Sequence, residues 1–134
     1  MAAPRDPRIV LEQMLEAIVD IEQITVGRSF EAYAADRLTR RAAERCIEIV
    51  SEASRRLPQD LKDRHPTIPW PKIAGIGNVL RHDYDVVNDA TIWHAATVDL
   101  LPLKAAVAAL LREWMRHRSR GGLSVADGST GWGR

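Results

Sequence analysis

The chain has 134 residues, of which 46% are hydrophobic and 28% charged, proportions typical of one globular domain and not of a disordered or fibrous chain. Its 19 lysines and arginines nearly balance 18 aspartates and glutamates, so net charge does not indicate a nucleic acid or a membrane as partner. The single cysteine excludes an internal disulfide framework. We recognise no signal peptide and no apolar run of the ~20 residues that span a bilayer, and therefore expect a cytoplasmic protein without a membrane partner.

Two helices are predicted before residue 36. Residues 1–6 are expected to form a flexible N-terminus, and the pair Asp6-Pro7 is a typical helix start. Apolar residues then recur at helical spacing to about Val26, after which Gly27 ends the first helix. Ser29 is a suitable N-cap for a short second helix.

The third predicted helix begins after Asp36, another suitable N-cap, and ends near Leu57. One face carries arginines interleaved with glutamates. This pattern is typical of a solvated face with pairs inside the helix, and alternatively of a surface that contacts RNA phosphates or an acidic partner. The opposite face carries a predicted apolar stripe of Leu38, Ala42, Cys46, Ile49, Val50 and Ala53. The proline-rich stretch from 58 to 71 predicts a connecting segment.

The C-terminal half predicts further helices. A fourth is expected from Trp70-Pro71 to Tyr84, with two glycines near its start that favour close packing. Asp89 can cap a fifth, which Pro102 either bends or divides. We expect a helical domain over residues 7–117 and a flexible tail over residues 118–134. Because no stretch alternates with period two, the sequence predicts an all-α fold, an up-down bundle of four or five helices.

Residues suited to phosphate chemistry gather at the end of the fourth predicted helix. Asn78 and His82 are one turn apart and share a face, Arg81 directly precedes His82, and Tyr84 follows it by two residues. Imidazole exchanges protons near neutral pH, and guanidinium binds phosphate oxygens in pairs. The same pattern also fits a histidine in a helix interface, an arginine paired with an aspartate and a tyrosine that anchors the core. No histidine, cysteine or carboxylate spacing predicts a metal site, and no cofactor is expected.

Three segments resemble the HepT-like branch of the HEPN superfamily: Asn-Val-Leu-Arg-His-Asp-Tyr at 78–84, Ile-Trp at 92–93 and Asp-Leu-Leu-Pro-Leu at 99–103. The resemblance extends over most of the predicted helical domain and includes residues 18–24 and 68–75. It implies a small helical bundle that forms a homodimer. It also implies a metal-independent endoribonuclease toxin of a type VII-like pair, neutralised by a minimal nucleotidyltransferase antitoxin of the MntA type. In this branch the antitoxin transfers AMP to the tyrosine that corresponds to Tyr84.

The family motif also contains an arginine, separated from the histidine by four to six residues and followed by a polar residue. Here those positions hold Gly77, Ile76 and Gly75, and Asn78 is the polar follower. Arg81 lies one turn after position 77, and helical side chains lean toward the N-terminus. Its guanidinium can therefore reach the space of an arginine at 77, which the two glycines are expected to leave open.

The resemblance and the residues together predict RNA transesterification, in which the ribose 2′-OH attacks the adjacent phosphate. His82 would act as general acid or base, Arg81 would stabilise charge on the phosphoryl oxygens, and Asn78 would orient the histidine or the substrate. AMP on Tyr84 would block the cleft by its bulk and negative charge. The absence of an arginine at position 77 favours an alternative, an inactive bundle that binds or regulates the nucleotidyltransferase. A third hypothesis is an interaction or nucleotide-binding bundle without a toxin role.

Overall fold

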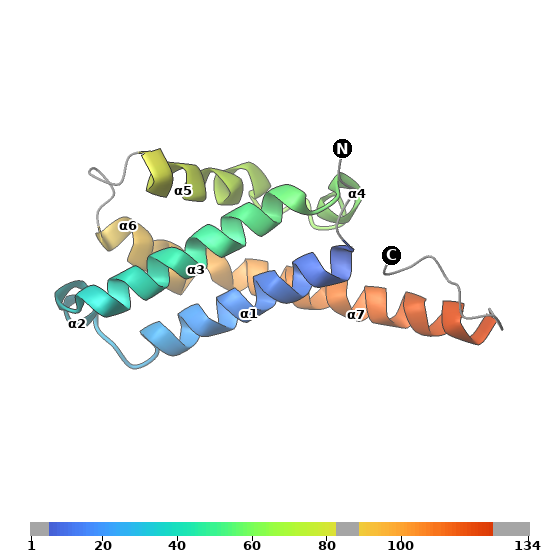
Figure 1. Cartoon of the computed structure of the whole chain (residues 1–134), viewed down its shortest axis with the longest axis horizontal. Coiled ribbons are helices and arrows are strands. Elements are labelled where there is room, and N and C mark those ends of the chain that lie inside the picture. The colour runs from blue at the N-terminus through green and yellow to red at the C-terminus, as the bar shows by residue number, and fades with distance from the viewer. Residues whose placement is uncertain (1–5, 83–88, 125–134) are drawn as a thin grey trace.

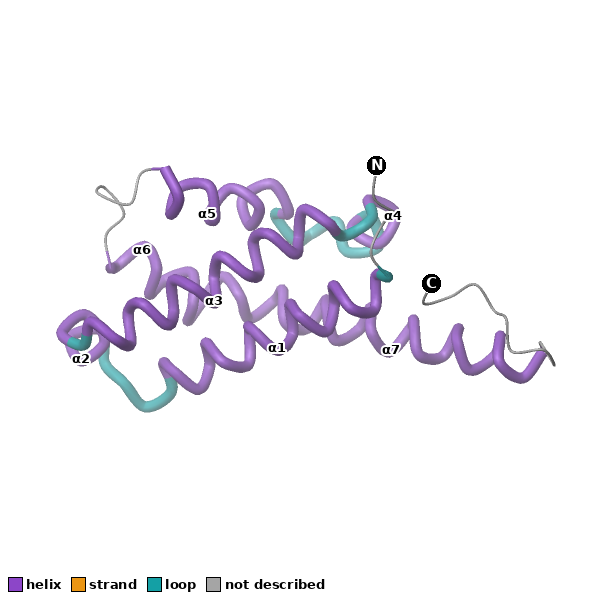
Figure 2. The backbone as a smooth tube through the Cα atoms, in the orientation of Figure 1, coloured by secondary structure: helices purple, strands orange, loops and turns teal. Residues whose placement is uncertain are grey.

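A computed structural model of the chain describes residues 6–82 and 89–124, and every regular element in these two ranges is a helix (Figures 1 and 2). The all-α prediction is therefore confirmed for the described part of the chain. In chain order the elements are α1 Pro7–Thr25, α2 Phe30–Ala35, α3 Arg37–Arg56, α4 Gln59–Lys62, α5 Trp70–His82, α6 Asp89–His94, the π-helical turn η1 Ala95–Asp99 and α7 Leu100–Ser124.

The four longer helices pack in the order α5, α3, α1, α7, and successive ones run in alternating directions (Figure 1). Helix α1 is central, since it packs against α3 on one side and α7 on the other. Its buried residues include Leu11, Met14 and Ile18, and those of α7 include Leu103 and Val107. Burying one such side chain stabilises the folded state by roughly 1.5–3 kcal/mol. The burial of this shared apolar face is therefore the main contribution to the stability of the bundle.

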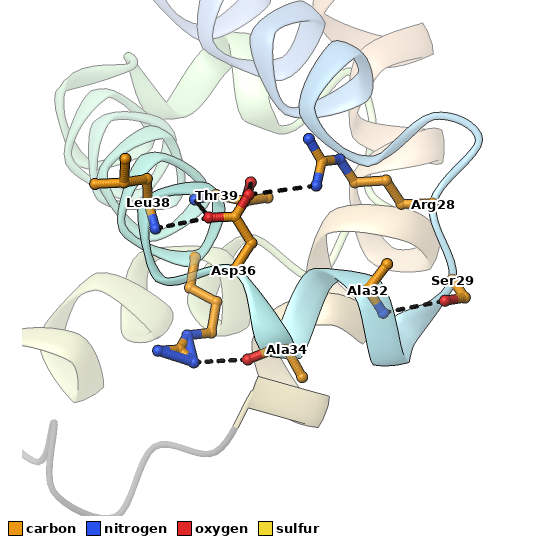
Figure 3. A network of polar contacts seen from close by, with 8 residues as sticks. Arg28, Ser29, Ala32, Ala34, Asp36, Leu38 and Thr39 are labelled. Atoms are coloured by element: carbon orange, nitrogen blue, oxygen red, sulfur yellow. Dashed lines mark hydrogen bonds and ion pairs between the residues drawn. The ribbon is translucent and has the colours of Figure 1, made fainter.

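Three polar side chains cap helix starts as the sequence predicts. The Asp6 carboxylate accepts from the Arg8 amide at 2.9 Å, and the Ser29 hydroxyl accepts from the Ala32 amide at 3.0 Å. The Asp36 carboxylate accepts from the amides of Leu38 at 3.1 Å and Thr39 at 3.3 Å, and from the Thr39 hydroxyl at 2.7 Å (Figure 3). These bonds satisfy amide groups that have no partner inside the helix, so the caps define where α1, α2 and α3 begin.

The predicted apolar stripe of α3 was wrong in its first two turns. Leu38 is 73% exposed and Ala42 is exposed, whereas Ala43 and Ile47 are buried. The face that packs inward is made largely of small and hydroxyl-bearing residues, namely Thr39, Ala43, Ile47, Val50, Ser51, Ala53 and Ser54. Hydrophobicity alone misplaces such a face, because a serine can be buried when its hydroxyl has hydrogen-bond partners.

The C-terminal helical region continues further than expected. Asp89, which we expected to cap a helix, is the first described residue of α6, and the π-helical turn η1 precedes Pro102, which lies inside α7. Helix α7 runs to Ser124, so residues 118–124, which we expected to belong to a flexible tail, are helical. Its last turns extend away from the bundle (Figure 1), because the hydrogen bonds within a helix need no cover from other elements. The connecting segment contains one short helix, α4.

The run from Asp89 to Ser119 is long and apolar enough to cross a membrane by length and composition, a property that the sequence analysis did not recognise. In the bundle, however, its residues Leu103, Val107 and Leu110 are at most 2% exposed. A core helix that packs against its neighbours passes the same test of composition, so one such helix is weak evidence of a membrane span.

Candidate functional site

Hydrogen bonds to α3 hold α5 in a defined rotation. The Ser51 hydroxyl donates to the Ala74 carbonyl at 2.8 Å and accepts from the Gly77 amide at 3.0 Å. The Arg55 guanidinium donates to the same Ala74 carbonyl, also at 2.8 Å. Among the residues of α5 whose burial is described, Trp70, Ile73, Gly77 and Leu80 are buried and form its inner face.

The predicted catalytic residues lie at the end of this helix. Asn78 is exposed, and position 82 follows it by one turn, on the face of α5 that points away from α3. Position 81 follows Gly77 by one turn, at the flank of the inner face. The side chains of Arg81 and His82, and the whole of Tyr84, lie outside the described residues. The roles of Asn78, Arg81, His82 and Tyr84 therefore stay predictions.

The two glycines at the motif position differ in burial, since Gly75 is half-buried and Gly77 is buried. A Cβ added to Gly75 would meet no atom within 4 Å, as expected. Gly77, in contrast, is buried, and its amide bonds to Ser51 of α3. The space that the sequence predicts beside Gly77 for a guanidinium stays a prediction, and the Ser51 hydroxyl of α3 lies 3.0 Å from the Gly77 amide nitrogen.

A hollow of 620 Å³ lies beside the end of α5, and we call it the α3 hollow. Arg40, Arg41, Glu44, Arg45 and Glu48 of α3 line it, together with Leu80 of α5 and Asp89 of α6. The sequence analysis singled out the arginine-rich face of α3 but did not predict that part of it lines a cavity. Only the tertiary structure brings α5 and α6 against this face.

Three basic and three acidic side chains thus meet in the α3 hollow. Arg40 lies 3.6 Å from the Asp89 carboxylate and also donates to the Ala34 carbonyl at 2.8 Å. Arg45 lies 3.6 Å from the Glu48 carboxylate. Burial raises the pKa of the Glu44 carboxyl above its usual value, although the nearby Arg41 opposes this shift. The charged form of Glu44 is therefore less favourable than it would be on an open surface, whereas Arg41 and Arg45 are exposed.

Tyr33 of α2 is a buried phenol outside the lining of this hollow. Its side chain is 0% exposed, and its ring packs against Trp93 with 5.1 Å between ring centroids. Its hydroxyl has no hydrogen-bond partner among the described residues. Burial raises the Tyr33 pKa to about 12, with added contributions from the negative charges of Glu44 and Asp89. A buried phenol without a partner is unusual, because it loses hydration without gaining a protein hydrogen bond.

Metal ligands and a cysteine thiol are the other groups that we considered for a functional site. Within residues 6–82 and 89–124, no group of three or more histidine, cysteine, aspartate or glutamate side chains could hold a metal ion. Cys46 packs against the core, and burial raises the pKa of its thiol, which disfavours the nucleophilic thiolate.

Comparisons with known proteins consistently find similarity to one family of ribonucleases. The family model described as "Ribonuclease HepT-like" matches residues 14–110. A "Probable ribonuclease HepT" of Thermococcus cleftensis is 37% identical over 100 residues, which cover 75% of this chain and 91% of the relative. A "Putative RNase TTE0752" of Caldanaerobacter subterraneus subsp. tengcongensis is 32% identical over 109 residues, which cover 81% of this chain and 97% of the relative. No solved structure matches the chain.

Proposed function

Because the chain belongs to the HepT-like ribonuclease family, we propose that it is a metal-independent endoribonuclease and the toxin of a pair with a minimal nucleotidyltransferase antitoxin. The observation that carries this proposal is the match of residues 14–110 to the ribonuclease family, a segment that includes Asn78, Arg81 and His82. Asn78, which we expect to orient the histidine or the RNA, is exposed on α5.

In the proposed reaction, the ribose 2′-OH gives its proton to a base and attacks the adjacent phosphorus. The bond to the 5′-oxygen breaks, and that oxygen takes up a proton, which leaves a 2′,3′-cyclic phosphate. His82 moves a proton in one of these steps, with a contribution of about 10²–10⁴-fold to the rate. Arg81 stabilises the charge on the phosphoryl oxygens, and Asn78 orients the histidine or the RNA.

A homodimer fits this reaction, because two copies supply both an acid and a base. The outer face of α5 near Asn78 points away from the bundle, so a second chain can approach it. We propose that the two α5 ends meet at a shared cleft in the cytoplasm. AMP on Tyr84 would then place bulk and negative charge at that cleft and inhibit cleavage.

The ribonuclease proposal is tested with purified wild type and His82→Ala on single-stranded RNA in the presence of EDTA. We expect the wild type to cleave RNA and His82→Ala to lose at least about 100-fold in rate. A matched control is His117→Ala, which removes an exposed histidine from the outer part of α7. Intact RNA with the wild type, or equal rates for wild type and His82→Ala, would contradict the proposal.

The second candidate is an inactive bundle that binds or regulates the nucleotidyltransferase, and the buried Gly77 at the motif position favours it. This candidate predicts intact RNA with every variant and a stable complex with the nucleotidyltransferase. The modification is tested separately by intact-mass analysis after co-expression with an active nucleotidyltransferase. We expect added AMP on the wild type and none on Tyr84→Phe. Unmodified wild type would contradict the proposed role of Tyr84.

A further inference from the structure

We propose that the outer part of α7 is an arm that docks in a groove between α1 and α3 of a second copy of this chain. We call residues 111–119 the α7 arm. The α1–α3 groove is a hollow of 400 Å³, lined mainly by Glu16, Ala17 and Asp20 of α1 and by Glu48, Ile49 and Glu52 of α3. This contact does not rest on the proposed function, because it involves neither α5 nor RNA.

One face of the α7 arm is open to solvent. The last turns of α7 extend beyond the other helices (Figure 1), and Met115 is 55% exposed. Leu111 lies one turn before it and is half-buried, and Arg112 and Arg116 lie beside these two side chains. The four residues line one hollow of 420 Å³ together with Glu12 of α1. This face therefore has an apolar centre and a basic edge, as a helix that packs in a groove has.

The arginines of this face have no carboxylate partner within the described part of the chain. Arg112 and Arg116 are exposed, and neither forms an ion pair with a residue of the ranges 6–82 and 89–124. Glu12, which lines the same hollow, lies 3.5 Å from Arg8. RNA phosphates would satisfy the two guanidinium groups but not the exposed Met115. The face therefore favours a protein partner that offers carboxylates beside an apolar surface.

The α1 side of the α1–α3 groove offers this combination. The floor of the groove contains Ala17, which is 3% exposed, and Ile49, which packs against the core. Glu16 and Asp20 are exposed at its edge, and neither forms an ion pair with another described residue. Two negative charges without a partner thus lie beside an apolar floor.

The charges on the α3 side of the groove are already paired. Glu48 lies 3.6 Å from Arg45. Glu52 lies 4.0 Å from Arg55. The groove also includes Arg56, so its lining has four carboxylates and two guanidinium groups. The groove is therefore acidic, and its excess negative charge lies on α1, where a basic helix would be attracted.

The spacing of the charges agrees on the two surfaces. Arg112 and Arg116 are one helical turn apart, and so are Glu16 and Asp20. A helix that lies along α1 can therefore pair both arginines with both carboxylates at once. Met115 would then cover the apolar floor, and its flexible side chain can adapt to that surface.

The arm that fills the groove comes from a second copy. The α7 arm is continuous with the part of α7 that packs against α1, and it points away from its own bundle (Figure 1). It would have to break to reach the middle of α1 in its own chain. Every copy has an arm and a groove, so two copies can exchange arms and close as a twofold dimer. This exchange leaves the outer face of α5 free for the contact proposed above.

Sedimentation velocity of the full chain over a range of micromolar concentrations tests the contact. We expect the wild type to self-associate. The arm variant Arg112→Glu/Arg116→Glu and the groove variant Glu16→Arg/Asp20→Arg should each raise the dissociation constant at least about tenfold, because like charges then face one another. An equal mixture of the two variants should associate about as tightly as the wild type, since opposite charges meet again at both contacts.

The matched control is Arg37→Glu/Arg41→Glu, which reverses two exposed arginines one turn apart on α3, outside the arm and the groove. It should associate like the wild type. Circular dichroism shows whether each variant is folded, and every substituted side chain is exposed. A monomeric wild type, unchanged association of the arm variant, or no association in the mixture would overturn the inference.

Binding of a labelled single-stranded RNA to the same variants separates the other possible occupant of the arm. Loss of RNA binding by the arm variant, with self-association unchanged, would assign the arm to nucleic acid and overturn the inference. Self-association is measured without RNA, so a chain that does not cleave RNA can still show it. Loss of association with retained RNA cleavage is expected of the arm variant and would leave the proposed function intact.

Discussion

The side-chain hydroxyl of Ser51 on α3 accepts a hydrogen bond from the amide N–H of Gly77 on α5 at 3.0 Å. The same hydroxyl donates to the Ala74 carbonyl at 2.8 Å, so one serine bonds to two backbone groups of the neighbouring helix. This contact turns Gly77 toward α3 and, one residue later, leaves Asn78 exposed. The rotation of the helix that ends at His82 therefore depends on a buried polar contact.

Ser51→Ala should lower the free energy of unfolding by about 1–3 kcal/mol, because it leaves the Gly77 amide buried near a methyl group. Urea denaturation measures this change. The control is Ser54→Ala, since the Ser54 hydroxyl is also buried but donates only to the Ser51 carbonyl in its own helix, at 2.7 Å. Ser54→Ala should lower the free energy of unfolding by less than Ser51→Ala does. An equal or larger decrease would contradict a stabilising role for the contact between α3 and α5.

The two glycines of α5 should respond oppositely to alanine. Gly75→Ala should raise the free energy of unfolding by roughly 0.5–1 kcal/mol, because its Cβ enters open space and alanine favours the helix. Gly77→Ala should lower it by about 1–3 kcal/mol, since the new methyl group must fit against α3. Thermal unfolding of the two variants beside the wild type provides the measurement. Stabilisation by both substitutions would refute the close approach at Gly77.

Tyr33→Phe should make the protein more resistant to alkaline pH. The folded state raises the Tyr33 pKa to about 12 from about 10, so the folded protein keeps a proton that the unfolded chain releases. This contribution to stability is complete below pH ~10 and is lost as the pH rises toward ~12. Urea denaturation at pH 9 and pH 11 should show a smaller loss for Tyr33→Phe than for the wild type. An identical loss in both proteins would contradict the burial of this phenol.

Asp36→Asn should reduce the sensitivity of the bundle to acid. The hydroxyl and amide of Thr39, the amide of Leu38 and the Arg28 guanidinium at 3.6 Å all favour the carboxylate, so the Asp36 pKa lies below its usual value (Figure 3). The stability that it contributes is complete above the unfolded pKa of about 3.9 and is lost as pH falls through the lower folded pKa.

The measurement for Asp36→Asn is the urea midpoint at pH 7 and at pH 3. Between these two values the wild type should lose more stability than Asp36→Asn, and the variant should be less stable at pH 7. Glu31→Gln provides the control, because Glu31 is an exposed carboxylate of α2 outside this cap. If Glu31→Gln and Asp36→Asn reduce the loss of stability between pH 7 and pH 3 equally, the cap of α3 is not the source of this loss.

Local interactions explain why much of the fold could be predicted. The helix starts at Asp6, Ser29 and Asp36 depend on a side chain and an amide two or three residues later, and such partners are adjacent in any sequence. The face of α1 could also be predicted, because every buried residue on it except Thr25 is apolar. The same method failed for α3, where Ser51 and Ser54 occupy the buried face in place of larger apolar residues.

The sequence by itself determined the helical class of the chain, the caps of its first helices and the segment that carries Asn78, Arg81 and His82. It did so because helical periodicity and capping act over only a few residues. Only the tertiary structure decided that Gly77 is buried, that the Tyr33 hydroxyl lacks a partner in the described chain and that Leu80 and Asp89 close a hollow over the arginines of α3. These features depend on how α2, α3, α5 and α6 pack together. The spacing of residues within one helix does not reveal which residues of a neighbouring helix pack against it.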